Sequence, residues 1–444
     1  MKKRMSQWLL IMSVAVLLAA CAGSTHTTAT IPQKTPTISV TATGTVASAG
    51  TLPTHRSTVD IEALINRIIA KMSPEEKVGQ LQLVEHPATM TDEEYDFSEV
   101  TKLVKDLHIG GFIIYTYRHG TVGELQNVIS QSQSMSTLPL MIATDQEGGD
   151  VDRLAVFDGG RPPASYFGYL NDPTKALAEG AHDGKRMLSL GFNTDMAPDV
   201  DIGDVNSTFL GSRLFGNTSQ KVVSLAGAFL DGLQANGIVG TIKHFPGIGS
   251  LPLGVDPHLT LPTINRTLEQ LNAVEFEPFR ALIAHGPGMV MTTHVLIPSI
   301  DPNVPATLSP DFVTGILRNK LGYQGVIVTD QLHMQAITQH YSLGEAAVRA
   351  LLAGNDILEG ANFIEYAIQI RDALLAALKS GRITDARLNQ SLQRIFRLKF
   401  AYMMGGQDGI TKLETYAGAA ATPNSFATAA IDTSRLVFNR REEA

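Results

Sequence analysis

Residues 325–330 read "GVIVTD", a short apolar run that ends on an acidic side chain. Its β-branched centre is typical of a strand that is buried on both faces of a parallel sheet. Seven other short apolar runs in the chain have the same character, so the sequence predicts eight strands. The other seven runs are residues 78–84, 110–115, 138–145, 192–201, 240–245, 288–295 and 355–360.

Stretches with helical spacing separate several of these runs. Residues 174–191 and 342–354 are examples, and Ser73 followed by Pro74 and two acids is a helix start. Alternation of strands and helices favours a parallel sheet. Eight such units over about 340 residues predict an α/β fold, a single (β/α)8 TIM-like barrel with long loops. An open, doubly wound sheet is the alternative.

The positions of polar residues favour the barrel over the open sheet. Polar side chains recur at the carboxyl ends of the predicted strands, and in a barrel these ends converge on one site. In an open sheet the same ends would spread along a line. The residues in question are Asp145, Asp199, Asp201, Lys243, His244, His294 and Asp330.

Composition and charge exclude some functions. The chain has 444 residues and a formal net charge of −8, with no dense basic block beyond its first residues, so nucleic-acid binding is not expected. Neither a G-x-S-x-G elbow nor a phosphate-binding loop occurs. The 12 histidines show no tight metal spacing, and we expect no metal and no cofactor. His333 and His340, seven residues apart, are interpreted as surface residues.

The N-terminus indicates export. Basic residues, an apolar run and "LAAC" at its end are typical of a bacterial lipoprotein signal, here residues 1–20, with Cys21 as the acylated residue. An ordinary cleaved signal with a coincidental cysteine is the alternative. Residues 21–58 are rich in Thr, Ser, Ala and Pro, which predicts a disordered tether. We expect the barrel domain at residues 59–404, a short tail at residues 405–444, and a membrane-anchored, extracytoplasmic location.

Carboxylates and imidazoles at strand ends suit glycoside hydrolysis. That reaction needs a nucleophilic carboxylate at the anomeric carbon and a proton donor for the leaving oxygen. It also needs charged and hydrogen-bonding groups that hold the sugar hydroxyls.

Six ordered segments over about residues 60–400 form a recognisable set. They are "TDQEGGDVDRLA" (144–155), "MAPDVDIG" (196–203), "GSRLFGN" (211–217), "IKHFPGIGS" with "DPH" (242–258), "MTTHVLIPSIDP" (291–302) and "GYQGVIVTDQLHMQAI" (322–337). In order and spacing they resemble glycoside hydrolase family 3, in particular its bacterial β-N-acetylglucosaminidase branch. The family's barrel fold agrees with the strand pattern.

The resemblance implies a role for individual residues. Asp330 matches the nucleophile, and a helix N-cap is its structural alternative. His258 matches the proton donor of this branch, with Asp256 orienting its ring, and a solvated loop histidine is the alternative. Imidazole titrates near neutral pH, which suits general acid–base catalysis. The residues that match the sugar-binding positions are Asp145, Arg153, Arg213, Lys243 and His244; for the two arginines, surface ion pairs are the alternative.

The segment that carries the proton donor departs from the family pattern. Ile248 stands where a histidine is usual, Ser250 where an aspartate is common, and the interval from Lys243 to His258 is two residues longer than usual. Gln331 follows the nucleophile where a second aspartate is common. The stretch "PGIGSLPLG" (246–254) is interpreted as a hinge with room to move. His294 is expected to be structural or to line the pocket.

We therefore expect a lipid-anchored, monomeric, exo-acting retaining β-N-acetylglucosaminidase with an oligosaccharide substrate from cell wall or chitin. Three alternatives remain open from the sequence. They are a β-glucosidase-like exo-glycosidase, a phosphorylase on the same framework, and a lipoprotein that binds wall sugars without cleaving them.

Overall fold

The computed structural model describes residues 60–87, 97–115, 120–404 and 413–418. The predicted signal, Cys21, the tether and most of the predicted tail lie outside these residues. Within the described ranges, no helix combines the length and the hydropathy that a membrane crossing requires.

Eight parallel strands form one sheet in the order β10-β1-β2-β3-β6-β7-β8-β9. The sheet closes on itself, because Val328 in β9 bridges to Ile357 beside β10. This closure confirms the predicted (β/α)8 barrel and rules out the open sheet. Each predicted run overlaps one strand, although the first run began too early, since Val78 and Gly79 end a helix. The strands are β1 (Gln82–Glu85), β2 (Gly111–Ile113), β3 (Met141–Thr144), β6 (Thr194–Asp195), β7 (Val239–Phe245), β8 (Met289–Thr292), β9 (Val326–Thr329) and β10 (Leu358–Ala361).

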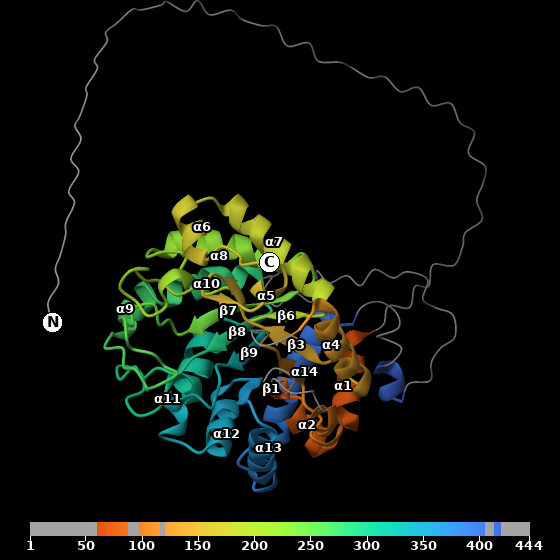
Figure 1. Cartoon of the computed structure of the whole chain (residues 1–444). Helices are drawn as coiled ribbons and strands as arrows, with labels where there is room; N and C mark the ends of the chain where they lie inside the picture. The colour runs from red at the N-terminus through yellow and green to blue at the C-terminus, as the bar shows by residue number, and fades with distance from the viewer. Residues whose placement is uncertain (1–59, 88–96, 116–119, 405–412, 419–444) are drawn as a thin grey trace, which may run out of the picture. The chain divides into compact units, whose positions relative to one another are not determined.

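Helices surround the strands (Figure 1). A short antiparallel hairpin, β4 (Gln146–Gly148) and β5 (Val151–Asp152), follows β3. The longer helical elements are α1 (Ile61–Lys71), α4 (Val122–Met135), α7 (Pro173–Leu190), α8 (Ser219–Gln234), the π-helix η6 (Asp311–Lys320), α12 (Leu343–Ala353), α13 (Ile364–Lys379) and α14 (Asp385–Tyr402). The shorter ones are α2 (Pro74–Gly79), α3 (Phe97–Thr101), the π-helix η2 (Lys102–Asp106), α5 (Ala155–Asp158), α6 (Ala164–Leu170), η3 (Gly211–Arg213), α9 (Leu268–Ala273), α10 (Phe276–Leu282), η4 (Ile283–His285), η5 (Ala306–Leu308) and α11 (Gln335–Thr338).

Local sequence signals explain several helix boundaries. Ser73 and Glu76 form a capping box at the start of α2, in which each side chain bonds the other residue's backbone amide. Asp172 caps α7 in front of Pro173, and Gly191 ends that helix in the left-handed region. These boundaries lie within one residue of the predicted ones.

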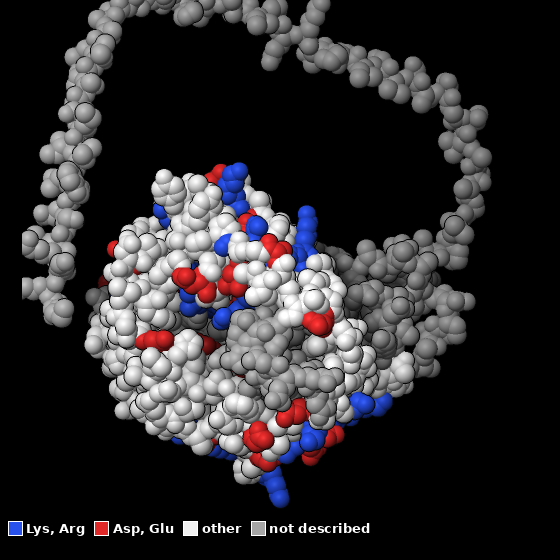
Figure 2. Space-filling view, in the orientation of Figure 1, with Lys and Arg blue, Asp and Glu red and all other residues white. Residues whose placement is uncertain are grey.

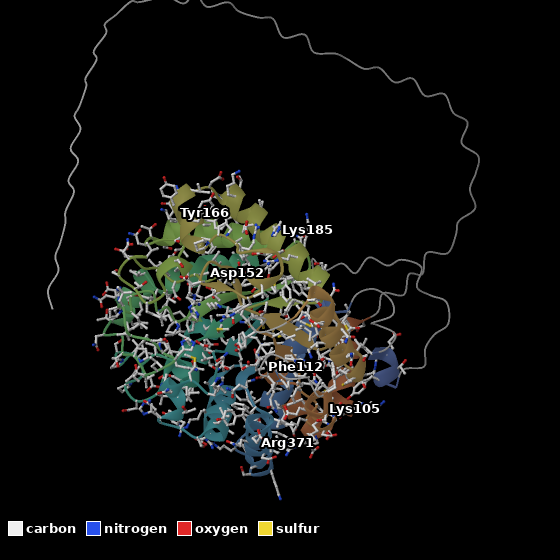
Figure 3. The ribbon with its side chains drawn as sticks, viewed as in Figure 1. Lys105, Phe112, Asp152, Tyr166, Lys185 and Arg371 are labelled. Carbon is white, nitrogen blue, oxygen red and sulfur yellow. The ribbon has the colours of Figure 1, made fainter. Side chains whose placement is uncertain are left out.

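The core lies within the barrel and between the barrel and its helices. Phe112 in β2 is fully buried, whereas Lys105 and Lys185 are exposed on the surrounding helical layer (Figure 3). The six described residues of the tail also contact the domain, since the Tyr416 hydroxyl donates to Glu76 Oε1 at 3.0 Å. The barrel thus presents its strand ends as a fixed frame for functional side chains.

Candidate active site

A pocket of about 520 Å³ lies at the carboxyl ends of the strands. Figure 2 shows a hollow in this face of the molecule where acidic and basic side chains meet. Seven of the residues expected from the sequence line this pocket, namely Asp145, Arg153, Arg213, Lys243, His244, His258 and Asp330. The barrel therefore brings together residues that are up to 185 positions apart in the chain.

Asp330 follows β9 and is held on several sides. Its backbone amide donates to the carbonyl of Thr292 at 2.7 Å. Its carboxylate accepts from the Thr293 hydroxyl at 2.8 Å and from the Gln331 amide at 2.8 Å. Burial alone would raise the pKa of Asp330, but nearby imidazoles and the Thr293 hydrogen bond lower it to about 2. The group is therefore an ionised, oriented carboxylate at neutral pH.

A buried ion-pair cluster forms the opposite wall, and the sequence analysis missed its central residue. Glu147 accepts two hydrogen bonds from Arg213, at 2.7 and 2.9 Å, and lies 2.6 Å from Lys243 Nζ. Lys243 also donates to Asp145 at 2.9 Å. Burial alone would raise the pKa of Glu147, but Arg213 and Lys243 hold it well below its usual range. In the sequence, only the position of Glu147 two residues after Asp145 indicates that it belongs to the site.

Lys243 and His244 are consecutive in β7, yet both line the pocket. In a regular strand neighbouring side chains point to opposite faces. Here the pairing of β7 with β8 shifts register between Ile242 and Phe245. Such an irregularity changes the direction in which a side chain points. Both Lys243 and His244 can therefore face the pocket.

His244 is a neutral imidazole in a defined tautomer. Its Nδ1 lies 2.8 Å from Asp201 Oδ2, and its Nε2 lies 3.1 Å from Arg213 Nη2. Arginine only donates, so Nε2 accepts and Nδ1 carries the hydrogen. Burial lowers the pKa of His244 to about 4, although Asp199 opposes this shift.

The third wall consists of polar side chains from the first, second and last strands. The Arg153 guanidinium lies 5.3 Å from the centre of the Tyr115 ring. Tyr115 Oη accepts a hydrogen bond from Gln331 Nε2 and lies 3.4 Å from Glu359 Oε1. Glu85 completes this wall. Nothing in the local sequence marks Tyr115, Glu85 and Glu359, so the sequence predicts no role for them.

His258 and Asp256 form a pair at the pocket rim. Asp256 Oδ1 lies 2.7 Å from His258 Nδ1 and also accepts from the His258 backbone amide at 2.9 Å. The His258 side chain is 60% exposed, so its Nε2 is accessible. The carbonyl of His258 accepts from the Gln335 amide at 3.2 Å, which ties this end of the loop to α11.

The expected hinge at residues 246–254 is wrong for its first half. Ile248 and Leu251 are buried, and the Ile248 amide donates to Asp201 Oδ1 at 2.6 Å. Gly247 has a φ of 115°, and a Cβ there would lie 2.7 Å from Glu275 Cβ, so the chain is tightly packed. An apolar side chain at position 248 fits because it enters the core. Ser250 and residues 252–254 are exposed.

Two histidines near Asp330 differ from each other. His294 is fully buried, bonded to Thr307 Oγ1 at 2.9 Å and to the Gln331 carbonyl at 3.0 Å, so its role is structural. His333 lines the pocket, and its interpretation as a surface residue is wrong. The same interpretation is confirmed for His340, which is exposed.

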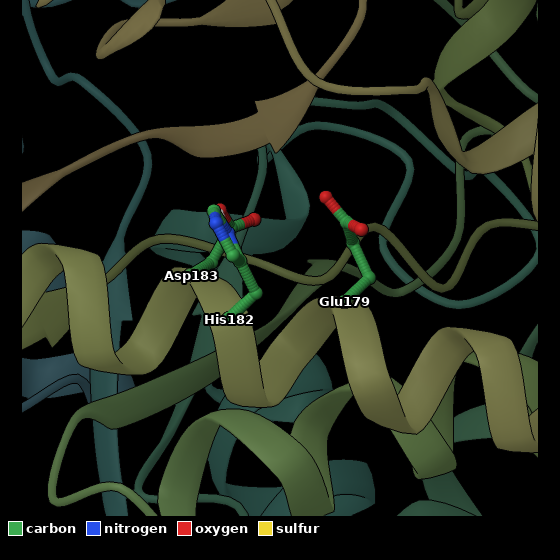
Figure 4. A group of neighbouring side chains, drawn as sticks. All are labelled: Glu179, His182 and Asp183. Carbon is green, nitrogen blue, oxygen red and sulfur yellow. The ribbon is translucent and has the colours of Figure 1, made fainter. Parts of the chain in front are cut away.

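Two groups of described side chains have the ligand types of a metal site. In the first, Asp199, Asp201 and His244, both ring nitrogens of His244 already have partners. The second comprises Glu179, His182 and Asp183, which project from α7 outside the pocket (Figure 4). Arg161 binds Glu179 through two hydrogen bonds of 2.7 and 2.8 Å. Both groups are therefore ion-pair networks.

Comparison with known proteins identifies the family. The family model described as "Glycosyl hydrolase family 3 N terminal domain" matches residues 73–398. "Beta-hexosaminidase A" of Pseudoalteromonas piscicida is 31% identical over 334 residues, which are 68% of this chain and 55% of that protein. "Beta-hexosaminidase LpqI" of Mycobacterium tuberculosis is 31% identical over 379 residues, 82% of this chain and 92% of the relative. The chain thus spans about half of the first relative and nearly all of the second.

A solved structure agrees with these relatives. The glycoside hydrolase family 3 β-N-acetylglucosaminidase from Paenibacillus sp. superposes with a TM-score of 0.69 at 34% identity. The likeness covers 82% of this chain and 68% of that one. Fold, strand-end chemistry and sequence likeness therefore converge: the chain belongs to glycosyl hydrolase family 3 and is a glycoside hydrolase.

Proposed function

We propose that this protein is an exo-acting, retaining β-N-acetylglucosaminidase that releases terminal N-acetylglucosamine from oligosaccharides. One observation carries the proposal. A single pocket holds an ionised carboxylate, Asp330, and the His258–Asp256 pair at its rim. The names of the relatives, β-hexosaminidase and β-N-acetylglucosaminidase, support the same sugar class.

In the first step, a carboxylate oxygen of Asp330 attacks the anomeric carbon. The bond from that carbon to the leaving oxygen breaks, and His258 gives the leaving oxygen a proton. Asp256, hydrogen-bonded to Nδ1, orients the ring. The products are the freed aglycone and a glycosyl ester on Asp330.

In the second step, His258 is neutral and takes a proton from water. The resulting nucleophile attacks the anomeric carbon, the ester bond to Asp330 breaks, and the sugar leaves with retained configuration. Thr293 and Gln331 hold the released carboxylate in place for the next cycle.

The remaining predicted residues bind the sugar in this proposal. Lys243 and Arg213 donate hydrogen bonds to hydroxyl oxygens, and Asp145 accepts from hydroxyl hydrogens. His244 lines the pocket beside Arg213 and holds that guanidinium in place through its Nε2, and Arg153 contributes a further cation. Their mutual ion pairs keep these groups in position before substrate enters.

We also propose that the enzyme works outside the cytoplasm, anchored through an acyl chain on Cys21 and acting as a monomer. The basic, apolar and "LAAC" pattern of the N-terminus supports this location. Cell-wall and chitin fragments are the substrates that such a location makes available.

The nucleophile can be identified by covalent trapping. An activated fluoro-N-acetylglucosaminyl fluoride should add one sugar to the peptide that contains Asp330, as measured by mass spectrometry. Asp330→Asn should lower the turnover of an aryl N-acetylglucosaminide about a thousandfold or more while preserving sugar binding. Asp311→Asn, at an exposed aspartate on η6, is the matched control.

The alternative functions predict other outcomes of the same assay. Faster turnover of an aryl glucoside than of the N-acetylglucosaminide would contradict the sugar assignment. A rate that depends on phosphate, with a sugar phosphate as product, would identify a phosphorylase. Sugar binding without turnover of any N-acetylglucosaminide would identify a binding protein.

A further inference from the structure

One histidine of the pocket takes no part in the mechanism above. His333 is the third residue after Asp330, lines the pocket and is half-buried. The chain beside it is fixed, because the Leu332 amide donates to the Glu359 carbonyl at 2.9 Å. A Cβ at Gly360 would lie 2.6 Å from the Leu332 nitrogen, so the segment after β9 is in close contact with β10. His333 therefore has a defined position close to the nucleophile.

A hydrogen bond to the backbone of β10 determines the tautomer of His333. Its Nδ1 lies 3.2 Å from the carbonyl oxygen of Gly360. A carbonyl oxygen only accepts, so Nδ1 carries a hydrogen and donates it. In the neutral ring, Nε2 then has no hydrogen and is a hydrogen-bond acceptor.

The surroundings of His333 favour the neutral ring. Burial lowers the pKa of His333, and the imidazoles of His258 and His294 act in the same direction. The Gly360 hydrogen bond and the negative charge of Asp330 oppose this shift, but the net change is downward. His333 is therefore neutral at neutral pH, and its Nε2 remains an acceptor there.

Nε2 is the accessible end of this ring. It forms no hydrogen bond with a described residue, and it is not enclosed by protein as the unpartnered Glu359 Oε2 is. His333 forms part of the pocket wall, and its ring interacts electrostatically with Asp330 and His258. The pocket thus contains an acceptor that lies near both reacting groups and has no partner among the described residues.

The proposed position of the sugar indicates which of its atoms meet this acceptor. Asp330 lies at the anomeric carbon, and Lys243 and Arg213 on the opposite wall hold hydroxyls further round the sugar ring. The groups next to the anomeric carbon are the acetamido group on C2 and the aglycone. Each can supply a hydrogen, either from the acetamido N–H or from an aglycone hydroxyl.

We propose that His333 is a specificity-determining residue, whose Nε2 accepts a hydrogen bond from the substrate beside the anomeric carbon. The inference rests on the proposed function, because it takes an N-acetylglucosaminide as the occupant of the pocket. The partner is an N–H or O–H group, since an acceptor cannot bind the acetamido carbonyl, which only accepts.

Two amide substitutions separate contact with the substrate from a structural role. His333→Asn keeps an amide near the place of Nδ1, where it can donate to Gly360, but has no atom at the place of Nε2. His333→Gln puts an amide oxygen near the place of Nε2 and loses the bond to Gly360. On an N-acetylglucosaminyl disaccharide, His333→Asn should lower kcat/KM about tenfold, the loss of one hydrogen bond, and His333→Gln should stay within about threefold of wild type. A purely structural role would reverse this order.

A second substrate identifies the hydrogen that His333 accepts. An aryl N-acetylglucosaminide has the acetamido N–H but no aglycone hydroxyl. A tenfold loss of kcat/KM on both substrates in His333→Asn would identify the acetamido N–H as the donor. A loss on the disaccharide alone would identify an aglycone hydroxyl.

His340→Asn, at an exposed histidine seven residues later, is the matched control and should leave kcat/KM on both substrates unchanged. Thermal melting shows whether each variant is folded, and the two His333 variants are compared with wild type independently. Wild-type kcat/KM in a folded His333→Asn, or a folded His333→Gln that is slower than His333→Asn, would overturn this inference alone. A wild type that turns over neither N-acetylglucosaminide would overturn the proposed function as well.

Discussion

The charged groups that we propose bind the sugar and the pair that we propose transfers the proton are held in different ways. Lys243 and Glu147 side chains are each 3% exposed and bond to each other and to further buried charges. The His258 side chain is 60% exposed, and its ring is held by a single carboxylate, Asp256. One part of the site is a buried network and the other a short exposed loop.

This difference matches the tasks that we propose for the two parts. Sugar hydroxyls need donors and acceptors at fixed positions, and buried ion pairs provide such positions before binding. A proton donor must approach the leaving oxygen and then admit water, which an exposed side chain allows. The two parts should therefore respond differently to substitution.

The largest effect is expected for Glu147→Gln. The change leaves Lys243 and Arg213 buried with less compensating charge, and breaking a buried pair costs about 3–5 kcal/mol of unfolding free energy. Sugar binding should be lost as well. The comparison is Glu179→Gln, which breaks a partly exposed pair with Arg161 and should cost about 1 kcal/mol or less. Denaturant unfolding measures both losses of stability. Equal losses in Glu147→Gln and Glu179→Gln would contradict the contrast between buried and exposed ion pairs.

Substitution of the exposed donor should affect rate and leave stability unchanged. His258→Ala should lower kcat on an unactivated disaccharide about 100- to 10,000-fold. Its free energy of unfolding should change by less than about 0.5 kcal/mol, because the side chain is exposed. His340→Ala, at another exposed histidine, should change neither quantity. An unchanged kcat in His258→Ala would mean that another group donates the proton.

The orienting carboxylate should contribute less than the histidine. Asp256→Asn keeps an oxygen that accepts from the ring but removes the negative charge beside it. We expect kcat to fall about tenfold with little change in KM. Steady-state kinetics on the same disaccharide measure both constants, and a loss equal to that of His258→Ala would indicate that Asp256 takes part directly.

The smallest effect is expected for the pH dependence of covalent trapping at Asp330. The pKa of Asp330 is lowered to about 2, so the carboxylate is ionised at higher pH and loses its charge only as pH falls through that value. Trapping by a sugar fluoride needs little help from an acid, so its rate should vary less than about twofold between pH 5 and 7. Turnover of an unactivated disaccharide should vary more, because its leaving oxygen needs the proton of His258. Parallel pH profiles for the two reactions would contradict this separation.

The sequence predicted the fold closely because the signals are local and repeated. Runs such as "GVIVTD" carry the strand pattern, and Ser73 with Glu76 carries its own capping box. The polar residues at the carboxyl ends of the predicted strands then indicated the pocket, because the carboxyl ends of parallel strands lie on one side of a barrel. Asp145, Lys243, His244 and Asp330 line that pocket for this reason.

The wrong predictions concern segments whose conformation depends on contacts with distant parts of the chain. The stretch "PGIGSLPLG" has the composition of a hinge, but Asp201 and the core hold Ile248 and Leu251. His333 has the spacing of a surface residue, but its position after β9 turns it to the pocket. Glycine and proline content indicates that a segment can be flexible. Packing and hydrogen bonds with the surrounding chain determine whether it is.

By itself the sequence determined the eight strands, their helices and the residue types at the strand ends, because each depends on neighbours within a few positions. Only the tertiary structure decided that Glu147 joins Arg213 to Lys243, that β7 turns both Lys243 and His244 inward, and that Tyr115 meets Glu359. These contacts join residues that are far apart in the chain. Their energies depend on burial and on distances across the pocket, which no local pattern encodes.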